Sequence, residues 1–345
     1  MKLFLVGPDF HDYNTSLALA FSNNNFKTHV MAYQDRNKSG KEILENKIFP
    51  KIGLYKYQQE NLKRFNDEFV EEVLKYRPTV LVVIRGDYIL KDSLLKIKRN
   101  IPEIKCVLWM MDSLSRFPKA LESLEMYYKV VCFEEDDKKY FEDVNKRIYI
   151  PMGYNSNTYQ QSQEDKDIDI CFAGYGYPKR KKILNGLIKQ LCDENLKIII
   201  IGEYGNIRRP LTYMYQKIKY RYLYKAVKNY NVTPEELNKL YNRSKICLNI
   251  NFEGHHGINP RTFEIAATNS FQLTDFNKGL SDFYDIQEDI IVYEEVNDLV
   301  EKVRYYLKNE KERNRIANNA YEKTVNKQSM ENRVEEFLKQ MNNRG

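Results

Sequence analysis

The stretch HHGINPRTFEIAA, residues 255–267, gathers groups that can bind or protonate a substrate into one short segment. It follows an apolar run, residues 245–252, and opens a predicted helix, so it lies where a strand meets a helix. Metal ligation would need a third ligand at a usable spacing, and adjacent histidines on a turn point in different directions. The stretch therefore fits an anion clamp better than a metal site.

The order of residues in this stretch suits a nucleotide diphosphate. Pro260 favours the first turn of a helix, whose N–H groups would face an anion with Arg261 beside them. Glu264, one turn further on, would accept hydrogen bonds from a ribose diol. The predicted contacts are Gly257, Ile258, Asn259, Arg261, Thr262 and Glu264. The alternative is that Arg261 and Glu264, three positions apart, form only a surface ion pair.

A second candidate anion loop is AGYGYPKRKK, residues 173–182. Its glycines free the backbone, and residues 179–182 bring four cations to the start of a predicted helix, which suits a diphosphate. The loop matches neither the dinucleotide fingerprint nor the Walker pattern. We predict that Gly174, Tyr175 and Arg180 contact the ligand, whereas solvated side chains remain an alternative for the lysines that follow.

The first half of the chain holds two candidate proton-transfer groups. His11 lies in the loop after the first predicted strand, and Asp112 ends the predicted strand 105–112. Because ligands bind beyond the carboxyl ends of parallel strands, both side chains would face a ligand. The alternatives are a capped turn for His11 and a helix-capping role for Asp112.

Short apolar runs alternate with longer amphipathic ones along the chain, which predicts an α/β protein with two Rossmann-like domains. Residues 155–167 are polar and form the best predicted linker. The expected domains are 1–155 and 165–325, with parallel sheets facing across a cleft. A last helix within 326–345 is expected to pack back on the first domain.

The composition narrows the class of protein. The net charge of +7 is mild, because 48 acidic residues are mixed with 55 basic ones, and it argues against a nucleic-acid binder. The five cysteines form no CxxC pair, so neither a disulfide framework nor a zinc knuckle is expected. The amino-terminal apolar run is too short for a signal peptide, and no apolar run is long enough to span a membrane. These features predict a cytoplasmic protein.

Residues 208–225 are unusual because they combine six basic residues and five tyrosines with no acid. The segment could lie on an anionic membrane at its inner face or stack an acceptor glycan. A solvated helix with a tyrosine-rich packing face is the third interpretation. Nucleic-acid binding through it would require a steep salt dependence.

An ordered series of motifs resembles the CgeB-like (spore-maturation) glycosyltransferases, which have the GT-B fold. The series runs FAGYGYPKR, VTPEELNKLYNRSKICLNIN, GINPRTFEIAATNSFQLTD, GLSDFY, KVRYYLKNEKERNRIANNA and SMENRV. It covers about the last 180 residues. The WMMD and IPMGYN stretches extend the resemblance loosely into the first half.

The resemblance implies that the carboxyl-terminal lobe binds a nucleotide sugar, a UDP-sugar first of all, and that the acceptor enters from the amino-terminal lobe. Retaining GT-B enzymes carry a Glu-x7-Glu motif; Glu264 matches its second Glu, while His256 occupies the place of the first. Asn231 and Val232 lie where the family's base pocket sits. The resemblance implies no metal and no cofactor beyond the donor substrate.

Together these features predict a glycosyltransferase of the hexosyltransferase kind that moves a sugar to a glycan or other cell-surface acceptor. His11, Asp112 and His256 are its candidate catalytic residues. The alternative, motivated by His256, is a non-catalytic subunit that binds a nucleotide sugar or a glycan.

Overall fold

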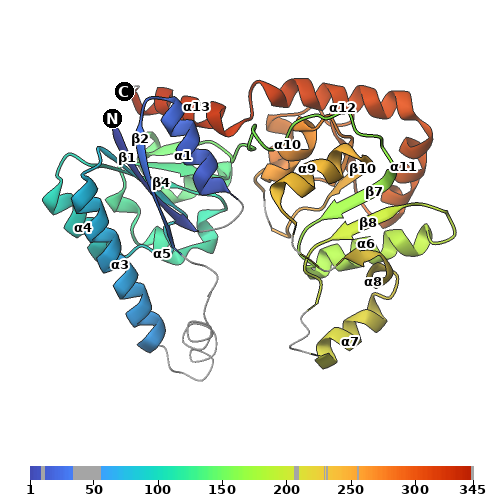
Figure 1. The fold of residues 1–345 in the computed structure, drawn as a ribbon, viewed down its shortest axis with the longest axis horizontal. Coiled ribbons are helices and arrows are strands. Elements are labelled where there is room, and N and C mark those ends of the chain that lie inside the picture. The colour runs from blue at the N-terminus through green and yellow to red at the C-terminus, as the bar shows by residue number, and fades with distance from the viewer. Residues whose placement is uncertain are drawn as a thin grey trace. The chain divides into compact units, whose positions relative to one another are not determined.

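The computed structural model describes residues 1–8, 12–33, 56–205, 210–228, 230, 232–254 and 256–342. The chain forms two compact units (Figure 1). The first combines Met1–Met152 with Met330–Gly345, and the second is Gly153–Ser329. The chain therefore leaves the first unit after residue 152 and returns to it with its last helix.

The first unit is built on a six-stranded parallel sheet with the strand order β2-β1-β3-β4-β5-β6. The strands are β1 (Lys2–Pro8), β2 (Lys27–Tyr33), β3 (Val80–Ile84), β4 (Lys105–Trp109), β5 (Lys129–Cys132) and β6 (Arg147–Tyr149). Leu3 of β1 pairs with Thr28 on one side and with Val80 on the other. The run VLVVI of β3 is buried at every position, as expected for a parallel strand covered on both faces.

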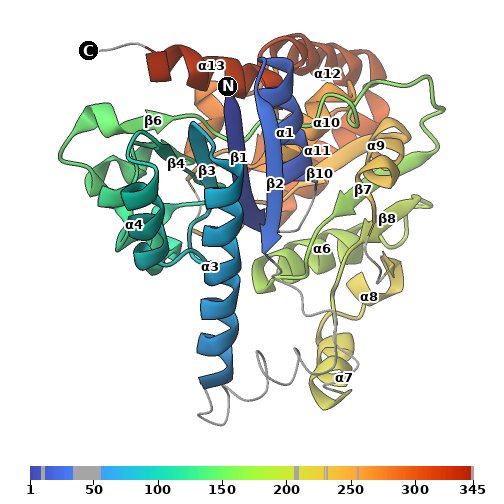
Figure 2. The same cartoon turned by 60° about the vertical axis from the view of Figure 1, so that its left-hand side comes forward.

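The helices described in this unit are α1 (Tyr13–Asn23), α3 (Lys56–Tyr76), α4 (Lys91–Asn100), α5 (Pro118–Leu121) and α13 (Met330–Asn342). The last helix, α13, lies against α1 (Figure 2). The ring of Phe337 from α13 is 5.3 Å from that of Trp109 and 6.1 Å from that of Phe21. The end of the chain therefore completes the core of the first unit by aromatic packing.

The second unit also has a six-stranded parallel sheet, with the order β12-β11-β10-β7-β8-β9. Its strands are β7 (Ile168–Ala173), β8 (Ile198–Ile201), β9 (Val227–Lys228), β10 (Ser244–Asn249), β11 (Gln272–Asp275) and β12 (Ile291–Tyr293). Its described α-helices are α6 (Pro178–Gln190), α7 (Pro210–Lys219), α8 (Leu223–Ala226), α9 (Pro234–Asn242), α10 (Pro260–Ala267), α11 (Val296–Lys308) and α12 (Glu310–Val325). The strand order reverses between β7 and β10, which is where α/β sheets bind ligands.

Alternating side chains of β7 and β10 supply two separate cores. Ile170 and Phe172 belong to one buried cluster, whereas Cys171 belongs to the other. Because successive residues of a strand point to opposite faces, the clusters cover the two faces of the sheet. Tyr159, from the predicted linker, is buried in the second cluster, so that segment packs into the unit despite its polar composition.

Three helices of the second unit begin at a proline that follows a strand or loop. Pro178, Pro234 and Pro260 occupy the first turn of α6, α9 and α10. Proline suits this position because its fixed φ is helical and its missing N–H would have no partner there. In α9 a capping box between Thr233 and Glu236 adds two hydrogen bonds. The sequence thus sets where α6 and α10 begin, at the edge where β7 and β10 end.

Candidate functional site

Two glycines let the loops after β7 and β8 approach each other closely. A Cβ at Gly202 would lie 2.1 Å from the carbonyl oxygen of Gly174, and Gly202 has φ of +141°. A Cβ at Gly174 would lie 2.9 Å from Nη1 of Arg180. A Cβ at Gly202 would force the two backbones apart, whereas a Cβ at Gly174 would displace the guanidinium group of Arg180.

Arg180 is a buried cation that ties two of these loops together. Arg180 is the third residue of α6, in its first turn, and is 7% exposed. Nε donates to the carbonyl of Ile250, just beyond β10, at 2.9 Å, and Nη1 donates to the carbonyl of Tyr175 at 3.3 Å. The guanidinium carbon lies 5.5 Å from the centre of the Phe172 ring and 5.3 Å from that of Tyr177. Arg180 therefore has a structural role in addition to any contact with a ligand.

Arg261 brings a second positive charge to the same place. Burial and, next in size, the neighbouring charge of Arg261 together lower the pKa of Arg180 to about 10. The charge of Arg261 also acts on the hydroxyls of Tyr204 and Tyr241, opposing the rise that burial causes in their pKa values. The charges of Arg180 and Arg261 therefore act on each other near the carboxyl edge of β7 and β10, an arrangement that an anion would stabilise.

Glu264 lies on the same helix as Arg261, one turn further on, and is buried. Its negative charge reaches Tyr241 of α9, whose pKa is raised first by burial and also by Glu264. Tyr241 is therefore within electrostatic range of both Arg261 and Glu264.

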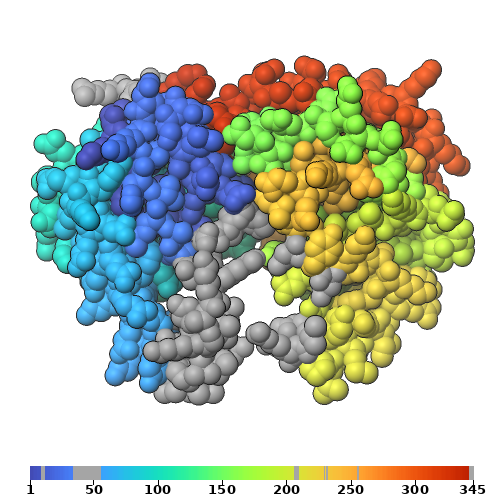
Figure 3. Space-filling model, viewed as in Figure 1, coloured from blue at the N-terminus to red at the C-terminus, as the bar shows by residue number. Residues whose placement is uncertain are grey.

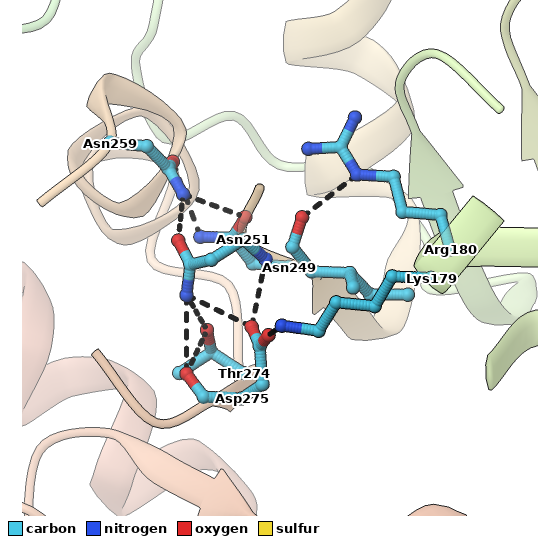
Figure 4. Close-up of polar contacts among 8 residues, drawn as sticks. Lys179, Arg180, Asn249, Asn251, Asn259, Thr274 and Asp275 are labelled. Carbon is cyan, nitrogen blue, oxygen red and sulfur yellow. Dashed lines mark hydrogen bonds and ion pairs between the residues drawn. The ribbon is translucent and has the colours of Figure 1, made fainter. Parts of the chain in front are cut away.

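A buried polar network fixes the loop that precedes α10 (Figure 4). Asn251 donates to the carboxylate of Asp275 at 2.9 Å, and its backbone N–H donates to the same oxygen at 2.8 Å. Asn259 donates to the side-chain carbonyl groups of Asn249 and Asn251. Asn249 in turn donates to Thr262 at 3.0 Å. These bonds fasten both ends of the loop to β10 and β11 and so fix the start of α10.

The four consecutive cations at the start of α6 do not act as one cluster. Lys179 forms an ion pair with Asp275 at 2.5 Å, and Lys181 donates to Gln216 of α7. Lys182 is exposed. Lys179 and Lys181 are thus engaged within the unit, whereas the charge of Arg180 is the one on which Arg261 acts. The partners Asp275 and Gln216 are far away in the sequence, which is why the pattern could not reveal them.

The remaining residues predicted around α10 divide between core and surface. Ile258 is fully buried in the second core cluster, so only its backbone can reach a ligand. Gly257 is buried, and His256 is exposed while its carbonyl accepts a hydrogen bond from the N–H of Gly279 at 3.0 Å. Val232 packs against the same cluster. His11 and Asn231 lie outside the described residues.

A cavity of about 370 Å³ opens beside the loops after β7 and β8. It is lined by Tyr175, Gly176, Tyr177, Lys181, Glu203, Tyr204, Gly205, Thr212, Tyr213 and Gln216. Of the predicted ligand contacts only Tyr175 lines it. The cavity therefore adjoins the guanidinium pair on the side of α7.

In the first unit, Asp112 is already engaged by its neighbours. Its carboxylate accepts from the backbone N–H of Ser113 at 2.9 Å and forms an ion pair with Arg116. The 3-10 helix Leu114–Arg116 that follows has Ser113 at its N-cap and no side-chain cap hydrogen bond. The carboxylate of Asp112 is therefore held by the adjacent N–H and by Arg116, and not by a helix-capping contact.

A nearby carboxyl group that the sequence did not single out is electrostatically more unusual. Asp137 is buried and accepts from the hydroxyl of Ser113 at 3.0 Å and from the N–H of Leu114 at 3.1 Å. Burial raises its pKa from 3.8 to about 6 despite these bonds. Because the folded-state pKa is raised, the stability that it contributes is present below pH 3.8 and is lost as the pH rises through 6.

Asp137→Asn should therefore raise the free energy of unfolding at pH 7.5 by about 2–3 kcal/mol and leave it nearly unchanged at pH 4. Asparagine keeps the acceptor for Leu114 but carries no charge to bury. Urea denaturation at the two pH values tests this, with the exposed Asp193→Asn as the matched control. A gain in stability that is the same at both pH values would contradict the assignment.

Several residues that build the site were missed at the sequence level. Tyr204 and Tyr241 are buried beside Arg261, and Asn251 and Asp275 hold the loop before α10. A signal existed for Asn249 and Asn251, which are polar residues at the end of an otherwise apolar strand run. No such signal identified the tyrosines, which are common throughout the chain.

Two further properties of the described residues bear on the site. No group of three or more His, Cys, Asp or Glu side chains among them could hold a metal ion. Nor does any helix in the described ranges have the length and apolar character needed to cross a membrane.

The sequence matches known proteins in its second unit and beyond. Residues 179–339 match the family described as glycosyl transferase-like. The chain is 23% identical over 275 residues to the spore protein CgeB of Bacillus subtilis (strain 168). This aligned region covers 75% of this chain and 81% of that protein.

Solved structures share the fold over nearly the whole chain. HepE from Anabaena, solved with UDP-glucose, has a TM-score of 0.69 at 10% identity and covers 99% of both chains. Sucrose-phosphate synthase from Thermosynechococcus elongatus has a TM-score of 0.68 at 13% identity, again over 99% of both chains. The two six-stranded parallel sheets therefore form a GT-B fold, and the chain is similar to the spore protein CgeB and to the glycosyl transferase-like family over residues 179–339.

Proposed function

We propose that the chain transfers a sugar from a nucleotide diphosphate sugar, with a UDP-sugar as the donor, to a glycan or other cell-surface acceptor. The observation that carries the proposal is the pair of guanidinium groups of Arg180 and Arg261 at the carboxyl edge of β7 and β10. Two like charges held together cost free energy, and a diphosphate would repay that cost. HepE, which shares the fold, has been solved with UDP and with UDP-glucose.

The chemistry follows from the leaving group. When the bond between the sugar and the diphosphate breaks, negative charge develops on the diphosphate oxygens. Arg261 and the N–H groups at the start of α10 would stabilise this charge, while buried Arg180 adds to the positive potential. Removing one such donor from an enzyme typically raises the barrier by about 3 kcal/mol. We propose that these groups supply the positive charge without a bound metal.

Glu264 and His256 complete the proposed donor site. Glu264 would accept hydrogen bonds from the ribose hydroxyls, because it is a buried carboxylate one turn from Arg261. His256 stands where related enzymes have a glutamate and would donate to a sugar hydroxyl. Gly174 and Tyr175 would approach the donor with their backbone, and Val232 would border the base.

A cavity in the first unit supports an acceptor site there. It has a volume of about 610 Å³ and is lined by Gln58, Gln59, Leu62, Asp87, Tyr88, Arg116, Phe117, Pro118 and Lys119. Asp87 is oriented by an ion pair with Arg85 at 2.7 Å. Aromatic rings with charged and amide groups suit a sugar, because rings pack on its apolar face while polar groups bind its hydroxyls.

A thermal-shift screen of UDP, GDP, TDP and CMP sugars tests the donor assignment. A specific ligand raises Tm by mass action, and we expect the rise with UDP-sugars. Equal melting temperatures with all four classes would contradict the proposal. The same screen repeated with EDTA tests whether binding requires a metal.

A second candidate function, a non-catalytic nucleotide-sugar binding subunit, is favoured by one observation. His256 replaces the first glutamate of the motif and is exposed, with no carboxylate at that position. Slow hydrolysis of the donor without acceptor would indicate an enzyme. Tight binding with no turnover over a panel of acceptors would indicate the binding subunit.

A further inference from the structure

Helix α7 carries an exposed apolar stripe. Leu211 is 82% exposed, Met214 60%, Tyr215 62% and Ile218 75%. Met214, Tyr215 and Ile218 follow Leu211 by three, four and seven positions, so all four side chains lie on one face of the helix. Elsewhere among the described residues, exposed large apolar side chains are scattered singly, which needs no explanation. Four on one helix of ten residues form a patch.

The opposite face of α7 anchors the helix to the second unit. Gln216 accepts from Lys181 of α6 and lies 3.5 Å from the hydroxyl of Tyr224. The ring of Tyr213 packs against Gly205 and lies 5.8 Å from that of Tyr224. Tyr213 and Gln216 are three residues apart, on the side away from Leu211 and Ile218. The apolar stripe is therefore directed outward, and α7 projects from the second unit (Figures 1 and 3).

Positive charge borders this stripe on both sides. Lys217 and Lys219 flank Ile218, both are exposed, and their ammonium groups lie over the rings of Tyr213 and Tyr215 at 4.8 Å and 5.8 Å. Arg221 and Lys225 follow and are also exposed. Residues 204–234 contain no Asp or Glu. The surface therefore pairs an apolar face with cations only.

We propose that α7 docks the protein on a bilayer that contains anionic lipids, with Leu211, Met214, Tyr215 and Ile218 inserted at the level of the headgroups. The lysines would bind the lipid phosphates while their alkyl stems follow the apolar side chains. Residues 204–234 contain no acidic side chain, so the surface that they bind should be anionic. A protein partner with charges of both signs would need acidic as well as basic residues in this segment.

Docking has a consequence for the site. The inner face of α7, with Thr212, Tyr213 and Gln216, lines the cavity of about 370 Å³ beside Tyr175. Since a helix is about 10 Å across, the bound helix would hold this cavity next to the headgroups. The inference does not depend on sugar transfer, because membrane binding is measured without substrate.

Co-sedimentation with vesicles tests the proposal. The full-length protein should bind vesicles of phosphatidylcholine mixed with phosphatidylglycerol at least about tenfold more tightly than vesicles of phosphatidylcholine alone. Replacing Leu211, Met214 and Ile218 together with glutamine should reduce this binding by about tenfold or more, because glutamine keeps the helix but removes the apolar area. The matched control replaces Leu19 and Val144, which are 42% and 73% exposed, with glutamine.

The role of the lysines beside the stripe is tested separately. Lys217→Glu with Lys219→Glu should weaken binding to the anionic vesicles by about tenfold or more, whereas Lys311→Glu with Lys327→Glu, both exposed, should not. Equal binding to the two kinds of vesicle would overturn the proposal, as would binding that survives the glutamine variant. The proposal would also be overturned if the unchanged protein bound no vesicles and instead formed a dimer that the glutamine substitutions dissociate. That result would assign the stripe to contact with a second copy of the chain.

Discussion

Arg261→Ala should weaken the binding of UDP by about 100-fold, which corresponds to the roughly 3 kcal/mol that one well-placed donor contributes to a developing or bound anion. The reason is that Arg261 lies in the first turn of α10 and its charge acts on Arg180 of α6, so both guanidinium groups and the helix N–H groups would act on the same anion. Calorimetric titration of UDP measures the change.

The same substitution should affect the fold less than it affects binding. Removing Arg261 relieves the repulsion that lowers the pKa of Arg180, so the free energy of unfolding should change by less than the free energy of UDP binding. Loss of affinity without loss of stability separates a binding role from a structural one. The matched control is Arg304→Ala, which removes a surface ion pair with Glu194 at 2.8 Å. An unchanged UDP affinity for Arg261→Ala would contradict the proposed diphosphate site.

Glu264→Ala should weaken UDP binding by about 10- to 100-fold, because a hydrogen bond to a charged group contributes about 1.5–3 kcal/mol. The loss should depend on the ribose. With 2′,3′-dideoxy-UDP, which lacks the hydroxyls, the substitution should change the affinity by less than about threefold. Calorimetry with both nucleotides and both proteins completes a double-mutant cycle.

A second variant controls for misfolding in this test. Glu264 is buried, and Glu264→Gln keeps its volume and one acceptor while removing the charge. We expect its UDP affinity to lie between those of the unchanged protein and Glu264→Ala. Equal losses for UDP and the dideoxy nucleotide would place the ribose elsewhere.

The fold was predictable from the sequence because each buried strand is a short apolar run bounded by a turn or a helix signal. KLFLV, LVVI and KICLN all became parallel strands. The proline at the start of α10 and the glycine at residue 174 were likewise local signals of where a helix begins and where the backbone needs room.

The parts of the site that could not be predicted depend on contacts between distant residues. The ammonium group of Lys179 forms an ion pair with Asp275, which is 96 residues away in the sequence. Asn251 is held by the same carboxylate. The outward direction of the apolar stripe on α7 was also hidden, because 3.6-residue periodicity reports a face but not whether that face meets the core or solvent.

The crystal structure of the protein with UDP tests the central claim most directly. We expect diphosphate oxygens within hydrogen-bond distance of the Arg261 guanidinium and the first turn of α10, with the ribose hydroxyls on Glu264. A diphosphate bound by Lys181 beside Tyr213 and Gln216, with no contact to Arg261, would contradict the proposal.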